Sequence, residues 1–230
     1  MIDQTALSTQ VYHILKERIV SDALKPGERL SIEALAEEFG VSRTPVKVAV
    51  DQLREEGLVA VARNRGTFVN TLSERDVVEQ LNVREMMEGY AARVVALPIP
   101  SQLAQDLAEY LNQERLLLDE PVTTQAFLRR NDLNARFHEA LVEAADNALL
   151  TRLYRRINVR HVILRSYRRR PLRDLGDVHR EHVVIYEAAC RTSNAALEQA
   201  VVAHTTHARE AFLRQQEELR ALTEVKVPAE

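Results

Sequence analysis

Three histidines in the second half of the chain have the spacing of side chains that face the interior of a helical protein. Each belongs to a mainly apolar series of residues three or four apart: Asn134–His138–Leu141–Ala145, Val178–His182–Ile185–Ala189 and Leu197–Val201–His204–Ala208–Ala211. Imidazole is the commonest metal ligand in proteins, and facing helices of a bundle often assemble such a site. A histidine on an apolar face is also often a hydrogen-bonded core residue, so periodicity alone leaves both interpretations open.

A second group of residues has the types and order needed to contact nucleic acid. Arg43, Thr44 and Lys47 lie in the first turns of a helix predicted to start after Ser42 and to end at Gly57. The expected buried face of that helix consists of Val46, Ala49, Val50 and Leu53. Cationic and polar side chains at the N-terminal half of such a helix can reach base edges or phosphates in the major groove. The pattern therefore predicts a DNA-binding helix.

The flanking elements complete a helix-turn-helix with a wing. The series Ile32–Leu35–Ala36–Phe39 predicts a preceding amphipathic helix, and Gly40 makes the turn. After the second helix, alternating residues predict strands at about 59–61 and 67–69 that form a hairpin. The residues at and beside its tip that we expect to approach a minor groove or the DNA backbone are Arg63, Arg65, Gly66 and Thr67.

The rest of the chain is predicted to be helical. Ser73 and Asp76 have the spacing of a capping box. Helices are expected at about 73–97, 101–118, 122–146, 148–169, 177–191 and 194–218. Short connections without a strand pattern indicate an antiparallel all-helical bundle. The sequence thus predicts a mostly α protein with a winged helix-turn-helix domain at residues 1–72 and a bundle at 73–222.

The segment from Arg152 to Arg173 contains nine arginines and no acidic residue. The simplest interpretation is a solvated or interfacial helix face, whose inward side would be formed by Leu153, Ile157 and Leu164. Alternatively, the row Arg152, Arg156 and Arg160 enters a cavity and binds a carboxylate or phosphate, or the arginines contact the DNA backbone.

Composition restricts the setting and the chemistry. The formal net charge is −3, and the first seventy residues are nearly balanced, so DNA affinity must come from local placement of cations in a dimer that reads two half-sites. Cys190 is the only cysteine, which excludes an intrachain disulfide, and we expect it to be buried. No apolar run is long enough to span a membrane and no signal peptide precedes the first helix, so a cytoplasmic protein is expected.

An enzyme is a further interpretation, because three histidines around a metal with open positions also occur in metallohydrolases. The sequence has no HExxH pattern, nucleophile elbow or phosphate-binding loop. Glu139 and Glu181 are the acidic neighbours of the histidines in sequence, and neighbours along a helix point away from the ligand face. Enzymatic activity is therefore not expected.

A dense motif runs through the two predicted N-terminal helices and the hairpin. It consists of Pro26-Gly27, Leu30, Leu35-Ala36, residues 40–46 (GVSRTPV), Leu53, residues 56–58 (EGL) and Gly66. This motif resembles the winged helix-turn-helix of the GntR family of bacterial transcription regulators. Lys47 stands where the family usually has an arginine, which removes the bidentate fork toward guanine, and Ile32 where it usually has an acidic residue.

The C-terminal region carries a second motif. It comprises residues 134–141 (NARFHEAL), Glu181-His182, His204, and Arg84 with Glu88 upstream. This motif resembles the FCD effector domain of the FadR-type branch of GntR regulators. The resemblance implies a bundle that holds a divalent metal, zinc first with nickel or manganese as alternatives. The ligands it implies are Asn134, His138, His182 and His204.

Together these features predict a ligand-responsive regulator. A homodimer would bind double-stranded operator DNA, and a small carboxylate effector would bind the metal and nearby arginines and shift DNA affinity. The arginines expected to contact the effector are Arg84, Arg152 and Arg156. In an alternative, the divalent metal itself is the signal. His179 and His207 are substitutes for the ligands that we do not favour.

Overall fold

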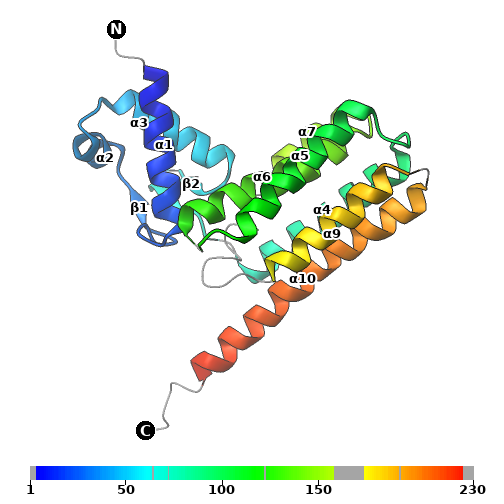
Figure 1. Cartoon of the computed structure of the whole chain (residues 1–230). Helices are drawn as coiled ribbons and strands as arrows, with labels where there is room; N and C mark the ends of the chain where they lie inside the picture. Colours follow the sequence, from blue (N-terminus) through cyan, green and yellow to red (C-terminus); the bar gives the residue numbers. More distant parts are fainter. Residues whose placement is uncertain are drawn as a thin grey trace. The chain divides into compact units, whose positions relative to one another are not determined.

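The chain divides into two compact units, residues 1–72 with 123–125 and residues 73–122 with 126–230. The computed structural model describes residues 4–63, 65–71, 73–121, 123–157, 174–191 and 193–224 (Figure 1). Each unit has its own secondary structure and its own core, and each is described separately.

The first unit is a three-helix domain with a small sheet. Its helices are α1 (Gln4–Val20), α2 (Ile32–Phe39) and α3 (Arg43–Glu55). Its strands are β1 (Arg29–Leu30), β2 (Val59–Ala62) and β3 (Gly66–Val69), which pair antiparallel in the order β1-β3-β2. The predicted helix-turn-helix and hairpin are confirmed, whereas β1 was not expected from the sequence.

The turn between α2 and α3 follows from the residues that end one helix and start the next. The Ser31 hydroxyl accepts a hydrogen bond from the Ala34 amide at 3.2 Å and caps α2. Gly40 ends α2 with φ 64°, a conformation that glycine adopts without a steric penalty. Ser42 occupies the predicted cap position of α3, although its side chain makes no capping hydrogen bond. The predicted inward residues of α3 are all buried: Val46, Ala49, Val50 and Leu53.

The second unit is the predicted helical bundle. Its described helices are α4 (Glu74–Val94), α5 (Ser101–Leu118), α6 (Thr124–Glu143), α7 (Ala148–Ile157), α9 (Leu175–Ala189) and α10 (Asn194–Glu224). The long helix α10 packs along both α4 and α9, α5 packs on α9, and α4 contacts α7 (Figure 1). The predicted capping box is present, because Ser73 and Asp76 each accept a hydrogen bond from the other's backbone amide. The part of the predicted 148–169 helix beyond Ile157 lies outside the described residues.

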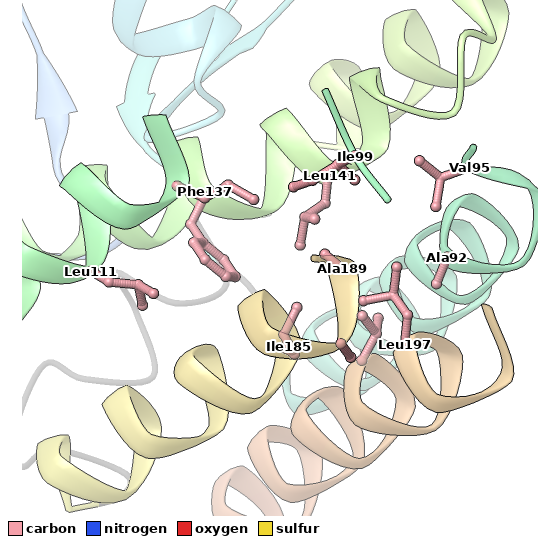
Figure 2. Packing of buried hydrophobic residues seen from close by; sticks show 12 residues of the cluster. Ala92, Val95, Ile99, Leu111, Phe137, Leu141, Ile185, Ala189 and Leu197 are labelled. Atoms are coloured by element: carbon pink, nitrogen blue, oxygen red, sulfur yellow. The ribbon is translucent and has the colours of Figure 1, made fainter. Parts of the chain in front are cut away.

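The core of this bundle is built from residues that five helices direct inward. Phe137 and Leu141 of α6 lie opposite Ile185 of α9, and Leu197 comes from α10 (Figure 2). Leu107 and Leu111 of α5 and Ala92 of α4 complete the cluster. The inward faces of α6, α9 and α10 are also the faces on which the sequence places the three histidines.

The expectation that Cys190 is buried is wrong. Cys190 is exposed and not buried, because it follows the last residue of α9 as its C-cap and leaves the inward stripe that ends at Ala189. No helix among the described residues combines the length and apolar composition needed to cross a membrane.

Candidate DNA-binding surface and metal centre

The predicted DNA-reading side chains of α3 lie on its outer face. Arg43, Thr44 and Lys47 are exposed in the first turns, on the opposite side from the buried Val46. Arg43 Nη1 lies 3.3 Å from Glu33 Oε1, but both side chains are largely exposed, so this ion pair is weak and easily exchanged for a phosphate. The geometry therefore leaves the start of α3 available to a ligand.

The hairpin of β2 and β3, called the wing below, carries a cationic tip. Arg63 and Arg65 are exposed, whereas Gly66 and Thr67 are half-buried at the start of β3. Gly66 has φ 106°, and a Cβ built there would lie 3.2 Å from Nε of Arg29. The Arg29 side chain thus extends along β3 from Phe68, with which Arg29 pairs, to Gly66. Sequence periodicity could not reveal this arginine, because a two-residue strand has no pattern.

The ion pairs of the first unit explain how a nearly neutral domain presents positive charge. Several of its cations are neutralised by carboxylates: Lys16 by Glu56 at 2.8 Å, Arg18 by Glu38 at 2.6 Å and Arg54 by Asp51 at 3.0 Å. Among the described residues, those of α3, β1 and the wing without an ion pair are Arg29, Lys47, Arg63 and Arg65. Positive charge is therefore left at α3, β1 and the wing because the other cations of the unit are paired, and not because the unit has an excess of basic residues.

In the second unit, the structure brings the three predicted histidines together. His138, His182 and His204 come from α6, α9 and α10, are buried, and offer ring nitrogens that all lie within 4.8 Å of one another. Nε2 of His138 and Nε2 of His182 are 3.3 Å apart. The rings of His138 and His204 are stacked, with centroids 4.8 Å apart.

Each of these histidines has a carboxylate at its other ring nitrogen. His182 Nδ1 lies 3.0 Å from Glu114 Oε1, and His204 Nδ1 lies 2.8 Å from Glu181 Oε2. His138 Nδ1 lies 3.0 Å from the second oxygen of Glu88, at ion-pair distance although the angles are not those of a hydrogen bond. Because an ionised carboxylate only accepts hydrogen bonds, it favours the tautomer in which Nδ1 carries the proton and Nε2 is bare.

This arrangement fits a divalent metal ion. The 3.3 Å between the Nε2 atoms of His138 and His182 matches the spacing of about 3.4 Å between neighbouring ligands of tetrahedral zinc. A proton is a poor substitute, because burial, together with the nearby Arg84 guanidinium, lowers the pKa of His138 to about 4. Burial also lowers the pKa of His204 well below its usual value. At neutral pH His138 and His204 are therefore neutral, which is the form that binds a metal.

Asn134, the fourth predicted ligand, has a buried amide nitrogen that makes no hydrogen bond. It lies one turn before His138 on α6. A buried polar atom without a partner is costly. An amide can turn by 180° about its last side-chain bond, so the carbonyl oxygen can occupy the same position. The role of Asn134 as a metal ligand stays a prediction.

Arg84 lies beside this centre, where it holds Glu88. Arg84 Nε donates to Glu88 Oε1 at 2.6 Å, and the Tyr154 hydroxyl donates to the same oxygen at 2.5 Å. Burial alone would raise the pKa of Glu88, but the charges of Arg84 and His138 outweigh it and hold that pKa well below its usual range. The predicted effector contact Arg84 is thus in the interior, but it is engaged by an internal carboxylate.

The expectation that Arg152 and Arg156 reach a cavity is not supported. Both are exposed on α7, whose buried residues are Leu150 and Tyr154, while Leu153 is 41% exposed. Of the predicted inward residues, Ile157 packs against the cluster of Leu150 and Tyr154 but Leu153 does not, and the two arginines lie outside this face. Arg160 and the remaining arginines of this segment lie outside the described residues.

Two histidines that the sequence offered as substitute ligands contact the carboxylates instead. His179 Nδ1 lies 3.0 Å from Glu114 Oε2, and His207 Nδ1 lies 2.7 Å from Glu181 Oε1. Glu114 was missed by the sequence reasoning. It lies on the stripe Leu107–Leu111–Glu114–Leu117 of α5, the same signal that identified the histidines.

A winged helix-turn-helix joined to a helical bundle defines a class of DNA-binding transcription regulators. Comparison with known families agrees, because residues 7–69 match the bacterial regulatory proteins of the gntR family and residues 79–207 match the FCD domain. The chain belongs to the GntR family and carries an FCD domain.

Individual relatives are regulators as well. YdhC of Bacillus subtilis, an uncharacterized HTH-type transcriptional regulator, is 30% identical over 204 residues, which cover 86% of this chain and 87% of YdhC. LutR of the same organism is 26% identical, covering 82% and 93%. A GntR regulator structure from Rhodococcus has a TM-score of 0.67 at 25% identity, covering 90% and 97%. McbR/YncC of E. coli shares the fold, with a TM-score of 0.71 at 21% identity over 94% and 100%.

Membership of this family gives the general function of the chain. GntR regulators bind operator DNA, typically as dimers. The chain is a DNA-binding transcription regulator and not an enzyme.

Proposed function

We propose that this regulator releases or binds its operator in response to a small organic acid held at a divalent metal in the FCD domain. The observation that carries the proposal is the convergence of three buried histidines, whose ring nitrogens lie within 4.8 Å of one another and of which two have Nε2 atoms 3.3 Å apart. Three converging imidazoles suit a divalent cation, and a divalent cation with open positions binds carboxylates well.

On the DNA side, we propose that a homodimer in the cytoplasm contacts two half-sites. The α3 residues that would enter the major groove are Arg43, Thr44 and Lys47, and the wing residues that would contact the adjacent backbone or minor groove are Arg63, Arg65, Gly66 and Thr67. Two copies are needed because each DNA-binding unit presents few unpaired cations, so one copy alone would bind weakly.

On the metal side, the proposed ligands are Asn134, His138, His182 and His204. When bound, the metal supplies a positive point that attracts and orients the carboxylate of an acid. Zinc suits three imidazoles and one amide oxygen, and nickel or manganese could also fit. If Arg84 binds the acid as well, the acid and Glu88 share one guanidinium, of which Nε donates to Glu88.

The size of the neighbouring cavity supports a link between effector and DNA. A cavity that adjoins Glu88, Leu141 and Val201 has a volume of about 10 Å³, room for about one water molecule. An acid that enters there must separate α4 from α6 and α10. Because α4 begins at Glu74, directly after the DNA-binding unit, a displacement of α4 would pass to the chain that leads into that unit.

A thermal-shift screen of small carboxylic acids, with and without added zinc, tests this function. We expect one class of acid to raise the melting temperature only when metal is present. In His182→Ala that response should vanish while DNA binding persists, and His13→Ala, at an exposed histidine of the other unit, should respond like the wild type. An effector response that survives His182→Ala would refute the proposal.

The nearly complete burial of the centre favours one second candidate, in which the metal itself is the signal. The three histidines are 1% to 2% exposed, which leaves little access for an organic acid. The two functions differ in the metal affinity that they require. A metal that resists chelators is structural or holds an effector, whereas a regulatory metal exchanges near its free cellular concentration.

A further inference from the structure

Each histidine of the centre has a carboxylate beside its Nδ1, at hydrogen-bond geometry for His182 and His204 and at ion-pair distance for His138. Glu88, Glu114 and Glu181 come from α4, α5 and α9, and each places an oxygen within 3.0 Å of Nδ1 of one histidine. In every case the histidine belongs to a different helix from its carboxylate. The pattern therefore arises from the packing of helices and not from neighbours along one helix.

The remaining oxygen of each carboxylate is also held. Glu88 Oε1 accepts hydrogen bonds from Arg84 and Tyr154. Glu114 Oε2 faces His179 at 3.0 Å, and Glu181 Oε1 faces His207 at 2.7 Å. A carboxylate fixed at both oxygens cannot rotate away, so the imidazole it contacts is fixed in orientation as well. His179 and His207 thereby acquire a role that does not require them to bind metal.

The net charge of the three carboxylates and Arg84 balances the charge of a divalent ion, which the neutral proposed ligands do not balance. Three imidazoles and the amide of Asn134 are neutral, so they offset none of the two positive charges of a divalent ion. Three carboxylates and the Arg84 guanidinium leave a formal charge of −2 around the site. The negative charge is therefore carried by carboxylates that contact the proposed histidine ligands and not by the ligands themselves.

We propose that Glu88, Glu114 and Glu181 are positioning residues of the metal centre. They hold each histidine with its proton on Nδ1 and its Nε2 toward the metal, and they supply the negative charge that Asn134 does not. This inference rests on the proposed metal site. It assigns metal affinity to residues that do not touch the metal.

Zinc binding to the full chain, measured by competition with a chromophoric chelator, tests the proposal. Glu114→Ala should weaken zinc binding by about 10- to 100-fold, as removal of a carboxylate behind a ligating histidine commonly does. Glu109→Ala is the matched control, because Glu109 lies on the same helix but is exposed, and its hydrogen bond is a local one from Gln113. It should bind zinc as the wild type does.

The two contributions of the carboxylate can be separated. Glu114→Gln keeps an oxygen that accepts from His182 but loses the charge, so its affinity should lie between those of the wild type and Glu114→Ala. Asn134→Asp places the missing charge directly at the site, so it should raise zinc affinity and restore much of the loss in Glu114→Gln. If Asn134→Asp leaves both affinities unchanged, charge compensation is wrong.

Histidine ring ¹⁵N spectra of the metal-free protein give a readout that does not depend on zinc. We expect His182 to carry its proton on Nδ1 in the wild type and in Glu114→Gln. An Nε2–H tautomer in the wild type would overturn the proposal, whether or not Glu114→Ala folds. Wild-type affinity in Glu114→Ala would overturn it as well. If His138→Ala and His182→Ala both retain full zinc affinity, the metal site itself is wrong.

Discussion

The guanidinium of Arg29 lies beside Gly66 at the tip of the wing, next to the space that a side chain at this position would occupy. Nε of Arg29 is 3.2 Å from the position that a Cβ at Gly66 would take, and Nη2 is 3.6 Å from it. The glycine therefore has two roles, since it adopts a positive φ and it leaves room for an arginine from another strand. Arg29 joins the two arginines of the tip as a third cation.

Arg29→Ala should weaken DNA binding without a preference for sequence. For each phosphate that the variant no longer neutralises, the slope of log affinity against log salt should become shallower by about 0.9, measured by fluorescence anisotropy on a duplex of about 30 base pairs. Arg54→Ala is the control, because Arg54 is paired with Asp51 on the far half of α3. Equal salt slopes for Arg29→Ala and the wild type would show that Arg29 does not touch a phosphate.

Gly66→Ala should lower stability and DNA affinity together. An alanine at φ 106° costs about 1–2 kcal/mol, and its methyl group displaces the Arg29 side chain. Urea unfolding gives the first effect and the duplex titration gives the second. If affinity falls in Gly66→Ala but not further in the Gly66→Ala, Arg29→Ala double variant, the loss acts through Arg29.

Lys47→Arg should change which bases are read. Lysine is a single point of charge, whereas arginine donates two parallel hydrogen bonds to O6 and N7 of guanine. We expect a new preference for guanine at one position of each half-site, worth about 1–3 kcal/mol, detectable by selection from a randomised duplex library. An unchanged selected sequence would place Lys47 at the backbone.

The metal-free protein should lose stability as the pH falls from about 6.5 toward 4. The pKa of His138 is about 4 in the folded chain and about 6.5 when unfolded, so in this range the unfolded state binds more protons. From these values His138 contributes on the order of 2 kcal/mol of lost stability between pH 7 and pH 5. Urea unfolding with a chelator present measures the loss, and His138→Gln should show a smaller one. Equal losses in both proteins would contradict the pKa of His138.

Much of the fold is local in origin and could be predicted. Gly40, the stripe of α3 and the Ser73–Asp76 capping box act within one or two turns of helix, so the sequence alone indicates where these helices start and end. The inward positions of His138, His182 and His204 follow from the same periodicity. Their convergence on one another does not, because it depends on how three helices pack.

The parts that escaped prediction depend on such packing or on ambiguous patterns. The pairing of Glu114 with His182 joins residues 68 positions apart. In α7, Leu149 and Leu153 compete with Leu150 and Tyr154 as the apolar stripe, and periodicity cannot choose between them. The stripe with Tyr154 faces inward, where the Tyr154 hydroxyl donates a hydrogen bond to Glu88 of α4. The orientation of Arg152 and Arg156 follows from that long-range contact.

Two adjacent residues of α9, Glu181 and His182, both belong to the histidine centre. His182 is itself one of the three, while Glu181 holds His204 of α10. A small rotation of α9 about its axis would therefore disturb two corners of the site at once. Assembly of the centre should consequently be all-or-none, and metal loading should protect the amides of α9 and α10 from hydrogen exchange as one cooperative block.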